Sequence, residues 1–593
     1  MTYRAPVRDL AFTLQAVAGI DQVAATGAFP DYDADLMGAV LEAAAQFSEG
    51  VLAPMNRIGD QKGSTWTDGA VTAAPGFADA YRQFAEGGWT GLSAPAHAGG
   101  QNLPKALELA AYETVHAANM AFGLCPMLSL AAIEALEAHG TPSQKDIYLT
   151  KLVSGEWTGA MVLTEPQAGS DLGALTTTAT PDGDGTYRLN GQKIYITWGD
   201  HDATENIVHL VLARLPDAPP GPKGISLFLA SKFLLNEDGS LGARNGFRAV
   251  GVEHKLGIHA SPTCVMSYEG ATAELVGQPN QGLAHMFIMM NAARYGVGVQ
   301  GIAIAERAYQ TAVNFSRERV QSRPVDGSLP TSGPIIHHPD VRRMLMTMRA
   351  TTEGCRALAS VAASAYDAAH HHPDPEVRKP NQAFYEFMVP LVKGYSTEMS
   401  LEVTSLAVQV HGGMGFIEET GVAQYYRDAK ILTIYEGTTA IQANDLVGRK
   451  TARDGGQTAK GIAGQIAVTE AALRQSGTAH ALAMAQRLQE GREAFLEVVD
   501  FVAGNTKASP NAVFAGSVPY LMLAGNLMAG WQLGRALLVA QDALAAGTDT
   551  AFMQAKVTTA RFYADHVLTK IAGLRDSIVH GADSVTALAL ESF

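Results

Sequence analysis

The amino-acid sequence predicts a mainly α-helical protein that carries one β-domain near its middle. Apolar residues recur at helical spacing before residue 161 and after residue 280, whereas residues 161–280 follow a strand pattern. The chain has 593 residues, which is too many for a single hydrophobic core. We therefore expect several domains in the order helical, β, helical and helical.

An N-terminal extension (residues 1–34) precedes a helical domain that we expect over residues 35–160. In "DADLMGAVLEAAAQFSEGVLAPMNR" and "KALELAAYETVHAANMAFGL", apolar residues recur at positions i, i+3, i+4 and i+7. Glycines and prolines in "LSAPAHAGGQNLP" separate the helices. This part therefore forms several packed helices.

Residues 161–280 are expected to form the β-domain. "TYRLNGQKIYIT" and "NIVHLVLARL" alternate polar and apolar residues or run through β-branched ones, and "PDGDG" and "NGQ" supply turns. The helical pattern then returns as a C-terminal helical bundle over residues 281–450. An additional, alanine-rich helical domain follows over residues 451–593.

The segment between Lys507 and Arg535 contains no charged residue and raises the question of a membrane. A spanning helix needs about 20 mostly apolar residues. Because Pro510 and Pro519 interrupt this segment, we predict a helix that is buried or lies at a domain interface. A membrane-associating hairpin is the alternative.

Charge and cysteine content exclude several classes of function. A net charge of −15 argues against nucleic-acid binding, which needs clustered Lys and Arg. Cys125, Cys264 and Cys355 lack the spacing of a disulfide framework or a structural zinc site, so we expect no metal and a reducing cytoplasm. The first 15 residues also lack the apolar core of a signal peptide.

Two familiar patterns do not indicate sites. Gly296, Gly298 and Gly301 form a G-x-G-x-x-G pattern inside a helical stretch, whereas a dinucleotide fingerprint joins a strand to a helix. Close helix packing explains these glycines better. The run His370–His372 is expected to be a solvated loop, because it lacks ligand spacing.

Two segments of the β-domain could contact a ligand. The loop "LTEPQAGSDLGAL" (residues 163–175) offers hydroxyls and backbone N–H groups, although a linker turn with capping residues explains it equally well. In the strand "NGQKIYITWG", Tyr195 and Thr197 share a face, which suits a flat heteroaromatic ring. An ordinary half-buried strand is the alternative.

Three further motifs lie in the region after residue 281. The glycines of "QVHGGMGF" allow a ligand or backbone to approach closely, as they would in a tight turn. Arg319 lies in a basic cluster and could pair with a phosphate or face solvent. In "ILTIYEGTTAIQ", the carboxylate of Glu436 ends an apolar run and precedes a glycine and two threonines.

Taken together and in this order, the motifs resemble the acyl-CoA dehydrogenase family. The resemblance rests on "TEPQAGSD", "NGQKIYIT", "KLGIHASPT", "QVHGGMGF" and "YRDAKILTIYEGTTAIQ" and covers residues 35–450. It implies a helical domain, a β-barrel-like domain and a four-helix bundle, with FAD between them. The extra tail resembles the long branch of roughly 600 residues, in particular its members that act on 3-methylthiopropionyl-CoA in sulfoniopropionate breakdown.

The resemblance also assigns residues. It implies FAD-binding roles for Met161, Leu163, Thr164, Gly169, Ser170, Tyr195, Thr197, Arg319, Gln409, Gly412, Gly413 and Thr438. It implies substrate-binding roles for Ser170, Asn291, Arg294 and Gly437. The family often has Trp at the position of Tyr195 and Asp at the position of Asn291.

The chemistry that this resemblance implies needs a base for the α-proton of a thioester, and Glu436 is the candidate. An ordinary glutamate has a pKa near ~4.3 and is a weak base, but burial beside Ile434, Tyr435 and an acyl chain raises its pKa. Some family members place the base one residue before the bundle arginine, and Ala293 occupies that position here. Glu436 is therefore the sole predicted base.

The resemblance further implies an acyl-CoA substrate, electron-transfer flavoprotein as the electron acceptor, and a homodimer. Membrane insertion and nucleic-acid binding are not expected. Two alternatives stay open from the sequence: an acyl-CoA oxidase that uses O₂, and a non-catalytic binding protein on the same fold. Fatty acyl-CoA of short or long chain length is an alternative substrate.

Overall fold

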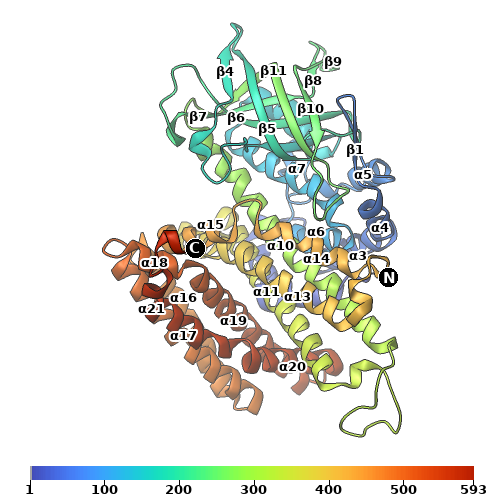
Figure 1. Cartoon of the computed structure of the whole chain (residues 1–593), viewed down its shortest axis with the longest axis vertical. Coiled ribbons are helices and arrows are strands. Elements are labelled where there is room, and N and C mark those ends of the chain that lie inside the picture. Colours follow the sequence, from blue (N-terminus) through green and yellow to red (C-terminus); the bar gives the residue numbers. More distant parts are fainter. Residues whose placement is uncertain (1–2) are drawn as a thin grey trace.

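The computed structural model describes residues 3–593 and places the sheet domain at one end of the molecule, with helices filling the rest (Figure 1). The two helical domains on either side of the sheet in sequence pack together beneath it, and the last helices lie on their far side (Figure 1). The predicted fold class, mainly α with a central β-domain, is confirmed. The exact domain boundaries stay predictions.

The sheet closes on itself as a barrel. Strand order is β10-β11-β5-β4-β6-β3, and β7 pairs with both β11 and β6. Every residue of β7 is buried, as are nearly all residues of β6, because both faces of these strands are covered. The strands are β3 Trp157–Val162, β4 Thr178–Pro181, β5 Thr186–Thr197, β6 Asn206–Arg214, β7 Ile225–Ser231, β10 Phe247–Val252 and β11 Thr263–Val276.

The N-terminal domain is helical with two departures from the prediction. A small hairpin of β1 (Thr65–Thr67) and β2 (Ala70–Thr72) projects toward the sheet domain, and β3 begins at Trp157, before residue 161. The main helices are α3 Ala34–Phe47, α4 Ala53–Lys62, α5 Phe77–Glu86, α6 Lys105–Ala118 and α7 Met120–His139.

Among residues 3–593, one helix is long and apolar enough to cross a membrane, and this helix is α7. Of its most apolar window, 89% is buried inside the protein. It packs against α10 and β3, so its apolar surface belongs to the core.

The bundle is organised around α10 (Gly282–Glu318), which packs against α13, α7 and α6. A Cβ at Gly298 would lie 2.5 Å from the carbonyl oxygen of Val392, and one at Gly301 would lie 2.9 Å from that of Ser396. The glycines therefore serve close helix packing. The other helices are α11 Pro339–His371, α12 Pro375–Pro390, α13 Ser396–His411, α14 Val422–Lys430 and α15 Thr439–Asp445.

The prediction of a loop at His370–His372 was wrong in part. His370 and His371 form the last turn of α11, and His372 is its C-cap. His370 and His371 are nevertheless exposed, as expected for a helix end that faces solvent.

The additional domain consists of α16 Gln457–Ser476, α17 Ala479–Asn505, α18 Pro510–Ala515, α19 Ser517–Ala545, α20 Thr550–His566 and α21 Ile571–His580. The uncharged segment forms α18 and α19, and α19 is largely buried between α11, α17 and α20. This matches the prediction of a helix at a domain interface. The N-terminal helix α1 (Val7–Phe12) reaches this domain, where the Arg8 guanidinium lies 4.3 Å from the Phe552 ring centroid.

Candidate active site

Glu436 lies in a short turn between α14 and α15 that has an unusual backbone. The φ angle of Glu436 is +54° and that of Gly437 is +88°. A non-glycine residue in the left-handed region costs roughly 1 kcal/mol or more, and such strain tends to occur at functional sites. The next residue, Thr438, ends the turn by capping α15: its Oγ1 accepts a hydrogen bond from the Ile441 N–H at 3.3 Å.

Two buried side chains hold this turn in place. The Lys393 Nζ donates to the carbonyl oxygen of Gly437 at 2.6 Å. The Gln442 Nε2 donates to the carbonyl oxygen of Glu436 at 3.2 Å and to that of Gly437 at 3.4 Å. Lys393 and Gln442 are almost completely buried, so the Glu436–Gly437 peptide and the peptide that follows it are fixed from inside the protein.

The electrostatic surroundings make Glu436 a usable base near neutral pH. Burial raises the pKa of Glu436 to about 7, and the positive charges of Arg294 and Lys393 oppose this rise. A base is most efficient when its pKa lies near the working pH. Ala293, beside Arg294 on α10, is buried and carries no titratable group.

Arg294 lies near Glu436 and has an unused hydrogen-bond donor. Its Nη1 donates to the Asn291 Oδ1 at 3.4 Å, and its Nε has no hydrogen-bond partner within residues 3–593. The side chain is only 7% exposed. A buried guanidinium with an unused donor indicates that a polar ligand group completes this site.

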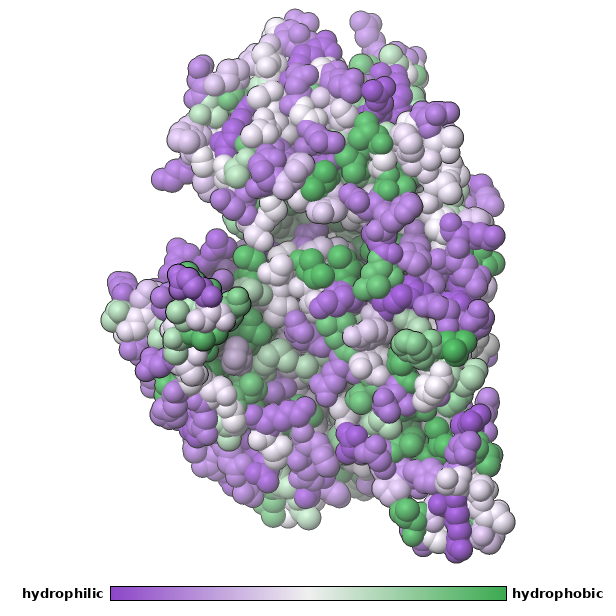
Figure 2. Space-filling view, viewed as in Figure 1, coloured by the Kyte–Doolittle hydropathy of each residue, from purple (hydrophilic) through white to green (hydrophobic). Residues whose placement is uncertain are grey.

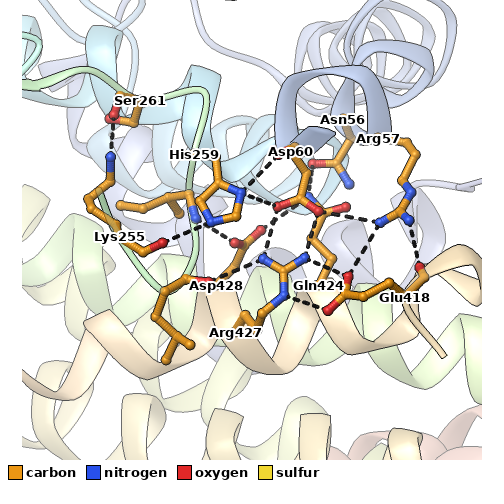
Figure 3. Close-up of polar contacts among 12 residues, drawn as sticks. Asn56, Arg57, Asp60, Lys255, His259, Ser261, Glu418, Gln424, Arg427 and Asp428 are labelled. Carbon is orange, nitrogen blue, oxygen red and sulfur yellow. Dashed lines mark hydrogen bonds and ion pairs between the residues drawn. The ribbon is translucent and has the colours of Figure 1, made fainter. Parts of the chain in front are cut away.

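A polar cluster places α14, the helix that leads into the Glu436 turn. Arg427 of α14 donates to Asp60 of α4 at 2.6 and 2.9 Å and to Glu418 at 3.1 and 3.2 Å, and it lies between these two carboxylates (Figure 3). Arg57 also pairs with both carboxylates. The cluster therefore ties the N-terminal domain to the bundle.

The same cluster reaches the β-domain through the next residue. The Asp428 Oδ1 accepts a hydrogen bond from the Ile258 N–H at 2.6 Å, and Ile258 has a φ of +46°. His259 binds the Asp60 carbonyl oxygen through Nδ1 at 2.8 Å. Asp428 is buried and lies eight residues before Glu436, so all three domains meet just upstream of the base.

Loop 163–175 is held against β5 by a buried ion pair. The Lys193 Nζ lies 2.9 Å from the Glu165 Oε1 and also donates to the carbonyl oxygens of Leu163 and Leu212. Glu165 accepts further hydrogen bonds from the N–H groups and hydroxyls of Thr176 and Thr177. Burial alone would raise the pKa of Glu165, but Lys193 and these donors hold it at about 2.

Comparison with known proteins identifies the family. Models of the acyl-CoA dehydrogenase N-terminal, middle and C-terminal domains match residues 38–156, 160–271 and 280–450, and a model described as acetyl-CoA dehydrogenase C-terminal like matches residues 461–589. The chain is 53% identical over 590 residues to 3-methylmercaptopropionyl-CoA dehydrogenase of Ruegeria pomeroyi, with 100% of each chain covered. This chain belongs to the acyl-CoA dehydrogenase family.

Two further relatives span nearly the whole chain. The broad-specificity linear acyl-CoA dehydrogenase FadE5 of Mycobacterium tuberculosis is 37% identical, with 97% of each chain covered. An acyl-CoA dehydrogenase of Bacillus anthracis, solved in complex with FAD, has a TM-score of 0.74 at 21% identity and covers 93% of this chain and 89% of its own, which shows the shared fold. As a member of this family the protein is an FAD-dependent oxidoreductase that acts on acyl-CoA thioesters.

The residues expected to bind the flavin ring of this acyl-CoA dehydrogenase lie close together. The Ile194 N–H donates to the Thr164 carbonyl oxygen at 2.9 Å, so the loop and the end of β5 run side by side. Tyr195 and Thr197 flank the buried Ile196. Tyr195 is 61% exposed, and Thr197 is half-buried. An exposed aromatic side chain beside the threonines Thr164 and Thr197 fits a flat ring.

The strand at this point is less regular than the predicted alternation. Between Cys264 and Met266, the register of β11 against β5 shifts, and Tyr195 has a φ of +59°. A bulge of this kind re-aims side chains near a site. Of the other predicted residues in this region, Met161 is buried on β3, Leu163 is half-buried, and Gly169 and Ser170 are exposed.

A second group of predicted FAD residues lies at the C-terminal ends of α10 and α13. Arg319 is the C-cap of α10 and follows Arg294 by 25 residues, which is ~38 Å along a helix. Gln409, Gly412 and Gly413 lie at the end of α13, and open space surrounds the position of a Cβ at both glycines. Arg319 therefore lies far along α10 from the predicted substrate residue Arg294.

We expect Lys193→Met to lose FAD, because Glu165 would remain buried without its counter-ion. Breaking such a pair costs about 3–5 kcal/mol, and loop 163–175 is the segment that would move. Flavin absorbance per chain after gel filtration measures the loss. Lys460→Met, at an exposed lysine paired with Asp500, is the control and should keep FAD. Full flavin occupancy in Lys193→Met would show that FAD binding does not depend on the Lys193–Glu165 ion pair.

Sequence reasoning missed the residues that support the site. Lys393 is an isolated lysine in the apolar stretch "FMVPLVKGY", and Lys193 sits inside a strand motif. A charged residue within an apolar run indicates a buried charge, and a buried charge needs a partner. The partners of Lys393 and Lys193 are distant in sequence, so the local sequence pattern does not predict which residues they are.

Proposed function

We propose that this protein oxidises 3-methylthiopropionyl-CoA to 3-methylthioacryloyl-CoA, with Glu436 as the base that removes the α-proton. The observation that carries the role of Glu436 is its position in a strained turn near the positive charges of Arg294 and Lys393. The full-length relative named as a 3-methylmercaptopropionyl-CoA dehydrogenase supports the choice of acyl group. The broad-specificity relative makes linear acyl-CoA the second candidate.

In this proposal FAD supplies the acceptor for the β-hydride. The chain binds and orients the thioester: Asn291, Arg294 and Ser170 contact the CoA portion, and the Glu436 N–H donates to the thioester oxygen. Donors of this kind contribute roughly 3 kcal/mol each when they meet a developing negative charge. Gly437 has no side chain, so the thioester can approach the turn.

The surface offers a route to this turn. Figure 2 shows an indentation between the sheet domain and the C-terminal helices, next to the position that α15 occupies in Figure 1. Because α15 begins three residues after Glu436, we propose that acyl-CoA reaches the base through this indentation.

The substrate is tested by anaerobic flavin reduction. Pentanoyl-CoA is the matched control for 3-methylthiopropionyl-CoA, because it replaces the sulfur with a methylene in a chain of equal length. We expect faster reduction by the thioether. Equal or faster reduction by pentanoyl-CoA and longer linear substrates would instead support a fatty acyl-CoA dehydrogenase.

We propose electron-transfer flavoprotein as the acceptor, in line with the exposed Tyr195 beside the expected flavin position. An oxidase would instead release peroxide. Steady-state turnover with electron-transfer flavoprotein and without peroxide under air supports the dehydrogenase. Peroxide formed at the rate of turnover would show an oxidase. The three cysteines are free and buried, which supports a reducing cytoplasm as the location.

We propose a homodimer in which the Arg319 and Gly412 region binds the FAD of the neighbouring copy. Apolar side chains gather there: Phe416 is 87% exposed, Val320 is 52% exposed and Met414 is 47% exposed. Phe416→Asp is expected to give a monomer with little bound FAD, measured by light scattering and flavin absorbance. Leu590→Asp, at an 84% exposed site near the C-terminus, is the control. A Phe416→Asp dimer with full FAD would contradict the proposal.

A further inference from the structure

Lys393 is a buried lysine that lies beside the Glu436 turn. It lies in the short helical segment Leu391–Tyr395 between α12 and α13, and its exposure is 0%. Within residues 3–593 it forms no ion pair, and its one hydrogen bond is the 2.6 Å bond to the Gly437 carbonyl oxygen. An ammonium without a direct counter-ion is costly to bury, so its position calls for a reason other than stability.

The charges that face Lys393 belong to the Glu436 turn. Burial lowers the pKa of Lys393 to about 7, and the carboxylates of Glu436 and Glu398 oppose this fall whereas Arg294 adds to it. Glu398 accepts a hydrogen bond from the Thr439 hydroxyl at 2.5 Å. Glu436 in turn lies near Arg294 and Lys393, and Asp445 and Arg449 lie near Arg294.

We propose that Lys393 is a positioning residue for the base: its ammonium fixes the Gly437 peptide and favours the carboxylate form of Glu436. This inference rests on the proposed role of Glu436. Arg294 also has a positive charge near the base, but its Nη1 is directed to Asn291 and it forms no bond to the turn. Among residues 3–593, Lys393 is the charged side chain that both hydrogen-bonds to the Glu436 turn and acts electrostatically on Glu436.

The pH dependence of flavin reduction distinguishes this role from a merely structural one. Flavin reduction requires the Glu436 carboxylate, so the rate rises with pH through the pKa of Glu436. A positive charge nearby lowers that pKa, and removing the charge must move the midpoint to higher pH. A lysine that only fills space would leave the midpoint unchanged.

The experiment compares Lys393→Met, Lys393→Gln and Lys393→Arg as FAD-loaded enzymes in anaerobic stopped flow. For Lys393→Met we expect a midpoint about one pH unit higher and a limiting rate about 10-fold lower, with little change in the substrate concentration for half-saturation. Lys393→Gln keeps a donor without charge, so it should shift the midpoint as much but lose less rate. Lys393→Arg should keep the wild-type midpoint.

Two results would overturn the inference: a wild-type midpoint in both Met and Gln variants, or a shift in Lys393→Arg as large as theirs. If Lys393→Met fails to hold FAD, the Gln and Arg variants decide by the same comparison, and loss of FAD in all three would show a structural role and overturn it. Lys460→Met is the control. Flavin reduction by Glu436→Gln at the wild-type rate would instead refute the proposed base.

Discussion

Glu436→Gln is expected to keep FAD bound and to slow flavin reduction by acyl-CoA about 10²–10⁴-fold. Glutamine preserves the size of the side chain and the backbone bonds from Lys393 and Gln442, so the turn should survive. Only the proton acceptor is lost. Anaerobic stopped-flow bleaching of the flavin measures the effect, because it isolates the reductive half-reaction from electron transfer to the partner.

The control for this variant is Glu419→Gln, at an exposed glutamate of the segment Glu418–Thr420. It should reduce its flavin at the wild-type rate. In the wild type, the rate should rise between about pH 6 and pH 8, since burial raises the pKa of Glu436 to about 7 and the deprotonated form is active. Bleaching of the Gln variant at the wild-type rate would remove Glu436 from the mechanism.

The fold was largely predictable because its signals are local. Helical periodicity and strand alternation depend on neighbours within one or two turns, and they placed the β-domain between helical regions. The small hairpin of β1 and β2 was not predicted, because each strand has only three residues. The helical conformation of His370 was not predicted, because polar residues at the end of a helix have the same composition as a loop.

Sequence analysis predicted only those residues of the candidate active site that belong to a recognised motif. Glu436 stands in "YEGTT", but the positive charges that oppose the burial-driven rise of its pKa lie elsewhere in the sequence: Lys393 is 43 residues away and Arg294 is 142 residues away. Periodicity within a segment does not say which buried charges meet. Likewise, "YRDAK" contains Arg427 and Asp428, yet their contacts with Asp60 and Ile258 appear only in the folded chain.

A buried network of ion pairs connects the additional domain to the rest of the protein, and the sequence pattern did not predict it. Arg356 of α11 is 2% exposed and binds Glu113 of α6 at 2.6 Å, Glu306 of α10 at 2.8 Å and Asp9 of α1 at 2.5 Å. Asp9 also pairs with Lys556 of α20. Through these contacts the N-terminal extension joins the bundle to the additional domain.

Arg356→Met is therefore expected to destabilise the protein by about 5 kcal/mol, the upper end for breaking a buried ion pair, since three carboxylates lose their shared cation. Burial already raises the pKa of Glu113, and Arg356 opposes this rise. Without Arg356 the buried Glu113 carboxyl should take up a proton, so the variant should recover part of its stability as the pH falls toward 5. Thermal unfolding followed by circular dichroism at pH 5 and pH 7.5 measures both effects.

Arg343→Met provides the matched control, because Arg343 lies on the same helix and pairs with Asp340 at the surface, with side chains 50% and 71% exposed. Exposed pairs contribute at most about 1 kcal/mol, so this variant should unfold near the wild-type temperature. If the two variants unfold alike, the network does not hold the additional domain. If only Arg356→Met is unstable and a second variant, Asp9→Asn, exposes α20 to proteolysis, the N-terminal extension links the additional domain to the bundle.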